Sequence, residues 1–199
     1  MNTVTKNRER YIGGSDIPTL FKLNKFISYD DLVKKYKYYY TKNIKFKNES
    51  TEYTLYGQYM ENIIREYINT KYNYKFKSKY KLFEDLHIRV NTDGYYKKLN
   101  TILEIKTNNG NHKNTFDYEL QAQLYMWAFN CDKTIIAMYT RPKDFYTGIS
   151  VDFHKDKSYF NLEFNEKQLI LKEINRNEFI IEEILKKIKK FWKEVKNGK

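Results

Sequence analysis

The chain has 199 residues, of which 41% are hydrophobic and 31% charged, a composition that excludes a disordered chain and favours one globular domain over residues 1–199. Its formal net charge of +12 suggests a polyanionic partner, although an abundance of Lys and Asn throughout a chain gives the same surplus without any function. The one cysteine excludes a disulfide framework and a Cys-x-x-Cys metal site, and the lack of a long apolar run leads us to expect a soluble cytoplasmic protein.

The first half of the chain is predicted to be mainly helical. A glycine turn at residues 11–16 leads into a short helix over residues 17–23, with Ser15 or Asp16 as its N-cap. Further along, apolar residues recur at the three- and four-residue spacing of a helix. Three more elements are expected here: a helix over residues 29–40, a polar loop over residues 42–51 and a long helix over residues 54–71.

The second half is predicted to be rich in strands. The pattern becomes strand-like after Asn73, and Asp93 and Gly94 come near the end of an alternating strand. Helices followed by a strand-rich middle with one inserted helix predict an α/β fold with a mixed central sheet. The expected elements are strands at 86–90 and 101–107 around a turn at 97–100, a helix at 118–129, strands at 134–140, 145–153 and 159–164, and one amphipathic helix over 166–196 with a solvated basic face.

Two carboxylates and an ammonium group are expected to meet in this sheet. Side chains alternate along a strand, so Glu104 and Lys106 share one face. If the two strands pair as a hairpin, Asp93 comes alongside Glu104. Adjacent carboxylates repel each other unless a positive charge lies between them, and Mg²⁺ or Mn²⁺ supplies that charge while it holds a phosphate oxygen. Lys106 would orient the attacking water or stabilise charge that builds up on the phosphate.

A simpler explanation of the Glu-x-Lys pattern is a charged strand that faces solvent, where such pairs are common by chance. Here, however, Ile102, Leu103 and Ile105 make the strand apolar apart from Glu104 and Lys106. Charged residues in an apolar strand are more often functional than those on an exposed one.

Two helices offer further polar groups. Glu61 lies beside the apolar stripe of its helix, so its carboxylate could face the same site; a simple ion pair with Arg65, four residues on, is the open alternative. Gln121 and Tyr125 are four residues apart on the later helix, so both can project from one face toward a substrate.

Taken together, five segments in order resemble the phage lambda exonuclease family, also called YqaJ-like viral recombinases, within the PD-(D/E)xK nucleases. The segments are RERYIGGSDI, GQYMENIIREYI, NTDGYY, ILEIK and QAQLYMWAF, which extend from Arg8 to about Trp127. The resemblance implies an α/β fold with a restriction-endonuclease-like core, in which helices flank a mixed central sheet.

By position, the resemblance assigns the reacting centre. Asp93 and Glu104 would bind the metal, helped by the backbone carbonyl of Ile105, and Lys106 would be the catalytic lysine. Glu61 would support the second metal or its water.

The resemblance also assigns the groups around that centre. Gln121, and with it Tyr125, would line the site. Arg8 and Ser15 match the positions that hold a 5′-phosphate in related enzymes, and Arg10 competes with Arg8 for that role. An arginine fork and the free N–H groups of a turn both suit phosphate.

The sequence departs from the family pattern at two points. Thr92 stands where the motif name has proline, which removes no ligand. The segment between Asp93 and Glu104 is shorter than in lambda exonuclease itself, so only a tight hairpin fits.

The function implied is that of a Mg²⁺-dependent deoxyribonuclease with two ions, which Mn²⁺ can replace. It would degrade one strand of linear double-stranded DNA from the 5′ end and leave 3′ overhangs for recombination in the cytoplasm of a bacterial host. A phage single-strand annealing protein is the implied partner, and a homo-oligomer such as a ring trimer is the implied assembly. Two alternatives stay open: a PD-(D/E)xK endonuclease, and an inactive basic DNA-binding module.

Overall fold

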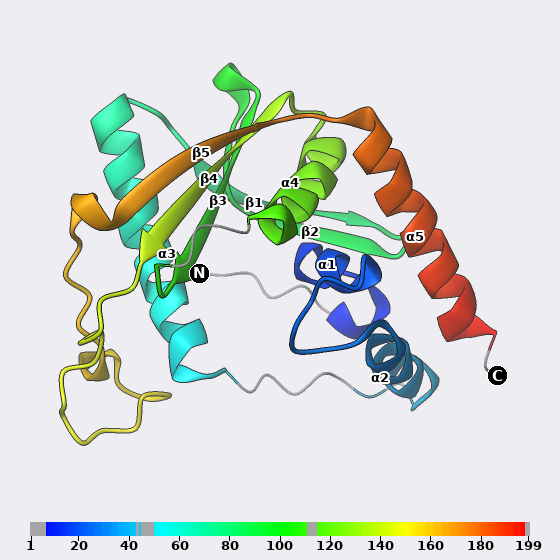
Figure 1. The fold of residues 1–199 in the computed structure, drawn as a ribbon, viewed down its shortest axis with the longest axis horizontal. Helices are drawn as coiled ribbons and strands as arrows, with labels where there is room; N and C mark the ends of the chain where they lie inside the picture. The colour runs from blue at the N-terminus through cyan, green and yellow to red at the C-terminus, as the bar shows by residue number, and fades with distance from the viewer. Residues whose placement is uncertain (1–6, 43, 45–49, 111–114, 198–199) are drawn as a thin grey trace.

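A five-stranded mixed sheet forms the centre of the computed structural model, which describes residues 7–42, 44, 50–110 and 115–197 (Figure 1). The strands lie side by side in chain order; β3 and β4 pair parallel, and the other neighbouring pairs are antiparallel. The strands are β1 (Lys77–Phe83), β2 (Ile88–Tyr96), β3 (Thr101–Asn108), β4 (Lys133–Thr140) and β5 (Leu169–Asn175).

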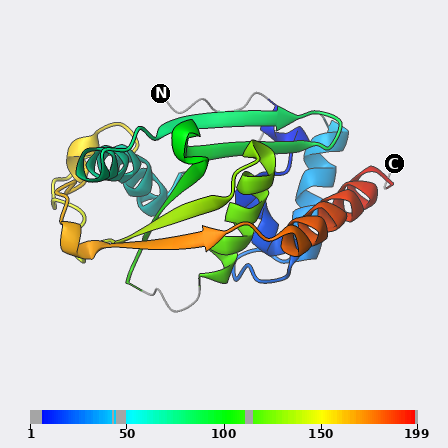
Figure 2. The same ribbon diagram turned by 90° about the horizontal axis from the view of Figure 1, so that it is seen from above.

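Helices cover both faces of the sheet. Figure 1 shows α3 on one side and α4 on the other, and the view from above in Figure 2 shows α5 following β5. The helices are α1 (Ile17–Leu20), α2 (Tyr29–Lys42), α3 (Glu52–Tyr72), α4 (Phe116–Phe129) and α5 (Glu178–Lys196).

The sheet divides the interior into two hydrophobic clusters. Ile102 and Ile136 belong to the cluster under α1, α2, α4 and α5. Leu103 and Ile135, their neighbours along β3 and β4, belong to the cluster under α3. Alternation along a strand therefore buries both faces, which explains why β3 and β4 read as nearly continuous apolar runs.

Helix α4 connects the parallel strands β3 and β4, so the carboxyl ends of both strands lie at the same edge of the sheet. Lys106 and Asn108 come at this end of β3. The N-terminal half of α3 approaches the same place, where a Cβ atom on Gly57 would lie 3.1 Å from Thr107 Oγ1. A glycine at this point lets the helix come close to the strand.

A β-bulge in β2 redirects Asp93. Thr92 and Tyr95 are three residues apart on β2, but their partners on β1 are only two apart, so β2 carries one extra residue. As a result, Val90 and Tyr95 pack against the same cluster, although side chains five positions apart on a regular strand would face opposite ways. The bulge therefore changes the direction in which Asp93 points.

The strands predicted at residues 145–153 and 159–164 are wrong. This segment contains turns, a 3₁₀ turn and one isolated bridge between Tyr146 and Phe160. Its apolar side chains, such as Phe145, pack against α3, and nearby Asp and Asn side chains accept hydrogen bonds from backbone N–H groups two positions on. Local side-chain bonds thus replace the ladder that a hairpin would need.

The single helix predicted over residues 166–196 is also wrong in its first third. Leu169–Asn175 forms β5, which covers the otherwise open edge of β4, and α5 begins only at Glu178. Asn177 is its N-cap, with Oδ1 accepting a hydrogen bond from Ile180 N. The rest of the prediction is confirmed, because α5 buries an apolar stripe: Ile181, Ile184, Ile188, Phe191, Trp192 and Val195.

Smaller differences concern element ends. Helix α1 stops at Leu20, since Lys22 adopts a left-handed φ of 60°. Asp16 precedes α1, but its side chain makes no capping bond to that helix. Strand β2 begins at Ile88 and continues to Tyr96, so Asp93 lies inside a strand and not near its end.

Most of the polar loop predicted at 42–51 lies outside the described residues. None of the helices in the described ranges has the length and apolar character needed to cross a membrane.

Candidate active site

Asp93 and Glu104 lie close together where β2 and β3 separate. The antiparallel pairing of these strands, which confirms the predicted hairpin, ends at the pair of Gly94 with Leu103. One step further, Asp93 Oδ2 accepts a hydrogen bond from the backbone N–H of Ile105 at 2.7 Å. Both carboxylates line a pocket of about 450 Å³ between the sheet and α3. The fork between the strands thus exposes two acidic groups to one cavity.

Lys106 and Gln121 form a hydrogen-bonded network with Glu104. Lys106 Nζ donates to Glu104 Oε1 at 2.7 Å and to Gln121 Oε1 at 3.0 Å. Gln121 Nε2 in turn donates to Glu104 Oε1 at 2.6 Å and to the Tyr125 hydroxyl at 2.7 Å. Gln121 and Tyr125 therefore project from one face of α4 toward the acidic pair, in agreement with their spacing in the sequence.

The surroundings of the site make it costly for Asp93 and Glu104 to carry their negative charges. Removal from water raises the pKa of Asp93 well above its ordinary value, and the charges of Glu104 and Glu61 raise it further. Burial also raises the pKa of Glu104, although Lys106 acts in the opposite direction. Burial acts to lower the pKa of Lys106, but the two carboxylates outweigh it and raise that pKa, so the side chain is held as a cation. One ammonium group thus faces more than one carboxylate.

The donor set fits a divalent cation. Glu104 is only 2% exposed, and its Oε2 has no hydrogen-bond partner among the described residues. A buried carboxylate oxygen without a partner is costly, and a hard cation such as Mg²⁺ would satisfy it. In the described ranges no three His, Cys, Asp or Glu side chains lie close enough together to form a metal cluster. The pair of Asp93 and Glu104 is therefore the core of the candidate site.

Glu61 lies on the wall of the same pocket but is held by another residue. Arg65 Nη1 donates to Glu61 Oε1 at 2.9 Å and to the backbone carbonyl of Asp93 at 2.8 Å. Both interpretations of Glu61 from sequence thus describe the structure, because it faces the pocket and pairs with Arg65. Arg65 also ties α3 to β2 beside Asp93, a contact that its spacing from Glu61 did not indicate.

The glycine turn before α1 rests on Tyr125. A Cβ atom on Gly14 would lie 2.4 Å from Tyr125 Cε1, so the backbone of the turn lies directly against the ring. Asp16 Oδ2 accepts a hydrogen bond from Gly13 N at 2.9 Å and fixes the turn. Ser15 is exposed at its tip. The turn is therefore connected to Glu104 through Tyr125 and Gln121.

Two guanidinium groups lie at this turn. Arg8, in a 3₁₀ turn, is half-buried; burial lowers its pKa, and the like charge of Arg89 lowers it further. The guanidinium group of Arg89 lies against the turn, since a Cβ atom added to Gly13 would be 2.6 Å from Arg89 Nη2. Arg10 is exposed; its carbonyl lies 3.1 Å from His87 Nδ1, and its charge acts on the His87 ring. The sequence did not indicate that Arg89 lies at this turn; the only signal was its position in a strand of alternating residues.

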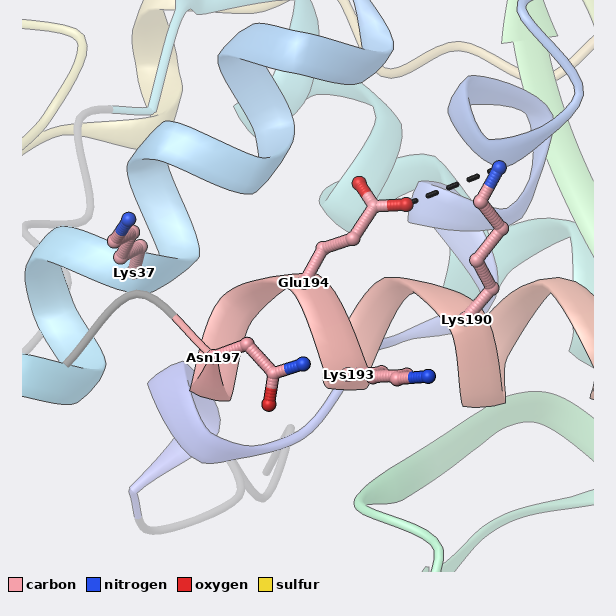
Figure 3. A pocket seen from close by; sticks show the side chains of 5 residues that line it. All are labelled: Lys37, Lys190, Lys193, Glu194 and Asn197. Carbon is pink, nitrogen blue, oxygen red and sulfur yellow. Dashed lines mark ion pairs between the residues drawn. The ribbon is translucent and has the colours of Figure 1, made fainter.

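A second pocket lacks the chemistry of the first. It has a volume of about 500 Å³ and lies between α2 and α5 (Figure 3). Its one lining carboxylate, Glu194, is 3.8 Å from Lys190 Nζ, so its charge is already balanced by an ion pair. This pocket belongs to the solvated basic face that was predicted for the C-terminal helix.

Comparison with known families agrees with this geometry. The model of the YqaJ-like viral recombinase domain matches residues 5–132. The chain belongs to this family. The matched range includes the glycine turn, Asp93, Glu104, Lys106 and Gln121, whereas β5 and α5 lie beyond it. A search of curated protein sequences found no match.

Solved structures share the fold of this YqaJ-family chain. An alkaline exonuclease from Laribacter hongkongensis is similar with a TM-score of 0.70 and 15% identity, over 96% of this chain and 90% of that chain. Its complex with dAMP gives a TM-score of 0.72 at 14% identity, with the same coverage. A phage-related exonuclease from Haemophilus somnus 129PT gives 0.68 at 17% identity, over 93% of each chain. The predicted α/β fold with a restriction-endonuclease-like core is therefore confirmed.

Family and fold together support a nuclease of the phage exonuclease type, which implies DNA as the substrate.

Proposed function

We propose that this YqaJ-family protein is a Mg²⁺-dependent exonuclease that degrades one strand of linear double-stranded DNA in the 5′→3′ direction and leaves 3′ single-stranded overhangs. The observation that carries the proposal is the pair of half-buried Asp93 and buried Glu104, with Lys106 bonded to Glu104 in one pocket. Such a pair is expensive to maintain in a fold unless a cation and an anionic substrate use it.

Asp93 and Glu104, with the backbone carbonyl of Ile105, would hold the first metal ion. Glu61 would contribute to a second ion, which requires it to exchange its bond to Arg65. Bound Mg²⁺, or Mn²⁺ in its place, would supply a Lewis acid for the phosphate and activate the attacking water. The oxygen of Glu104 that has no hydrogen-bond partner in the described part of the chain supports this assignment.

Lys106 would be the catalytic lysine. Its ammonium group is held as a cation and can stabilise the charge that develops on the phosphate in the transition state. Gln121 would act as a positioning residue, because its amide bonds to both Glu104 and Lys106. The lysine then points at the reacting phosphate without losing the contact that orients it.

Arg8 and Ser15 would bind the terminal 5′-phosphate. Support comes from the two guanidinium groups at the glycine turn and from the exposed position of Ser15. Arg10 is the weaker candidate because it lies beside His87. Tyr125 is 4% exposed, so it would connect this subsite to Gln121 more than it would bind substrate.

Two features of the assembly belong to the same proposal. A homo-oligomer, with a ring trimer as its simplest form, would enclose the DNA and use the charge of +12 to retain the strand between cuts. A phage single-strand annealing protein would take the overhang in the cytoplasm of the bacterial host. Light scattering that found only monomer at working concentrations would remove the ring.

The test is digestion of linear duplex DNA labelled separately at its 5′ and 3′ ends, with Mg²⁺ or with EDTA, beside a covalently closed circle. We expect metal-dependent release of the 5′ label as mononucleotide while the circle stays intact. Cutting of the circle would indicate an endonuclease of the same fold. Binding without cleavage in any divalent metal would indicate an inactive DNA-binding module.

A further inference from the structure

Arg141 reaches the catalytic pocket from a part of the chain that the proposed mechanism does not use. It follows β4, and its backbone N–H donates to Asn108 O at 2.7 Å, which fixes it at the carboxyl ends of β3 and β4. Its side chain lines the same pocket as Glu104 and Lys106. Arg141 is therefore a cation at the wall of the candidate active site.

Two aromatic rings hold the guanidinium group in place. Its Cζ lies 4.4 Å from the centre of the Tyr53 ring and 4.9 Å from that of Phe145. Phe145 is 6% exposed and packs edge-on against Tyr56 at 5.3 Å, so that ring cannot move freely. Stacking of this kind orients a guanidinium group without using its N–H donors.

Among the ion pairs formed by described residues, none includes Arg141. Arg141 is only partly buried and lines the pocket, so a ligand in the pocket can reach it, and the ring of Tyr53 beside it is 50% exposed. An oriented arginine whose side-chain N–H donors bond to none of the described residues, beside an acidic pair, suits a phosphate group.

The position of Arg141 indicates which phosphate it would meet. Tyr125 and the glycine turn approach Glu104 from α4 and α1. Arg141 lies beyond Lys106 and Thr107, beside the start of α3; Figure 1 shows this region on the other side of β3 and β4 from α1. A strand that entered at the glycine turn would pass the acidic pair before it reached Arg141.

We propose that Arg141, held by Tyr53 and Phe145, binds a backbone phosphate on the 3′ side of the bond that is cut. The exposed ring of Tyr53 supports the adjoining sugar or base. The assignment to the 3′ side rests on the proposed 5′→3′ function. The contact with a phosphate does not depend on that direction. Arg141 would thus fix the strand at a second point, so that the scissile phosphate between the two points is aligned with Lys106.

The first experiment measures binding without cleavage. Fluorescence anisotropy of a labelled duplex in EDTA is recorded over a range of salt concentrations for the parent, Arg141→Gln, Arg141→Lys and the matched control Lys143→Gln. Lys143 is an exposed neighbour outside the pocket lining, and its change removes the same charge. Arg141→Gln should weaken binding by about tenfold and reduce the slope of log K against log salt by about 0.9, the value for one lost phosphate contact.

Arg141→Lys should keep the slope but bind more weakly than the parent, because lysine keeps the charge and loses the fork. Circular dichroism checks that each variant is folded. Equal slopes for Arg141→Gln and Lys143→Gln would overturn the proposal, and so would a parent protein that does not bind DNA. A parent that binds but never cleaves would refute the proposed function alone, since this measurement needs no cleavage.

The second experiment locates the contact. Duplexes carry one neutral methylphosphonate at successive positions on either side of the first cleavable bond. In the parent, neutralising the phosphate on the 3′ side should reduce affinity by about as much as Arg141→Gln does, and the two changes together should cost no more than either alone. Additive losses at every position would overturn the assignment.

Discussion

The contact between the glycine turn and Tyr125 makes a strong prediction for Gly14→Ala. A Cβ at this position would lie 2.4 Å from Tyr125 Cε1 and 2.5 Å from its hydroxyl oxygen, more than 1 Å inside the normal separation of about 3.5–4.0 Å. Tyr125 has little room to yield, because it is 4% exposed and its hydroxyl is bonded to Gln121. The variant must therefore displace the ring or the turn.

The size of the effect follows from two opposing contributions. Overpacking in a buried site costs about 1–3 kcal/mol. Replacing glycine by alanine recovers about 0.4–1 kcal/mol, since the unfolded chain loses conformational freedom. We expect a net destabilisation of about 1–2 kcal/mol, which lowers the melting temperature of a chain of this size by about 2–8 °C. The displaced ring should also reduce cleavage, because Gln121 loses its hydrogen bond to Tyr125 and is held less firmly against Glu104 and Lys106.

Urea unfolding followed by circular dichroism measures this cost in two backgrounds. Tyr125→Leu removes Cε1, Cζ and the hydroxyl, which are the three atoms nearest to the added Cβ. In that background Gly14→Ala should be neutral or slightly stabilising. Gly57→Ala is a control for a milder approach. Its Cβ would be 3.1 Å from the single atom Thr107 Oγ1, and the preference of about 1 kcal/mol for alanine in a helix should offset that contact, so stability should change little. An equal cost of Gly14→Ala in both backgrounds would refute the contact as its cause.

Two further variants test the site, and a third tests a buried polar residue outside it. Lys106→Ala should reduce the cleavage rate by at least about 10²–10³-fold while duplex binding in EDTA persists; cleavage at the parent rate would remove Lys106 from the mechanism. Arg8→Ala should abolish the preference for 5′-phosphorylated ends, measured as the ratio of rates on phosphorylated and unphosphorylated duplexes, and a parent ratio of one would contradict the assignment. Gln123→Ala should lower stability in urea by about 1–3 kcal/mol without changing the rate per folded molecule, since both ends of its amide bond to the backbone near α5.

The parts of the fold that the sequence predicts are those in which one periodic pattern decides burial. The helix predicted at 54–71 is found as α3, Glu52–Tyr72, because its apolar residues recur at helical spacing. The strand predicted at 101–107 is found as β3, Thr101–Asn108, since both of its faces are buried. In these segments local pattern and tertiary environment agree.

Predictions fail where distant partners decide the structure. The residues of β5 have apolar character that suits a helix as well as a strand, and the free edge of β4 selects the strand. The segment at 145–153 has aromatic residues typical of strands, but the ring of Phe145 packs against Tyr53 and Tyr56 of α3. The same limit applies to Arg141, whose place in the pocket depends on the rings of Tyr53 and Phe145.

The candidate site was predictable to the extent that its chemistry is local. Glu104 and Lys106 share a face of one strand, so the alternation of side chains brings them together in sequence reasoning as in the structure. Asp93 required the hairpin, and its direction depends on a bulge that no pattern in the sequence marks. Arg65 and Arg89 reach the region only through packing between elements.

Burial of a polar side chain does not by itself identify the site. Gln123 and Glu104 are equally buried, at 2% exposure. The amide of Gln123 donates to Asn175 O at 2.8 Å and accepts from Asn177 N at 2.9 Å. Both ends of the amide are therefore bonded to backbone groups, and these bonds join α4 to the chain before α5. Glu104 retains one oxygen that bonds to none of the described residues, and it lies beside a second carboxylate. Tyr56 and Thr134 also have a buried oxygen without a partner among the described residues, so a missing bond alone does not mark a functional residue. What sets Glu104 apart is that its incomplete carboxylate lines a pocket together with Asp93 and Lys106, where a cation and a phosphate group can reach it.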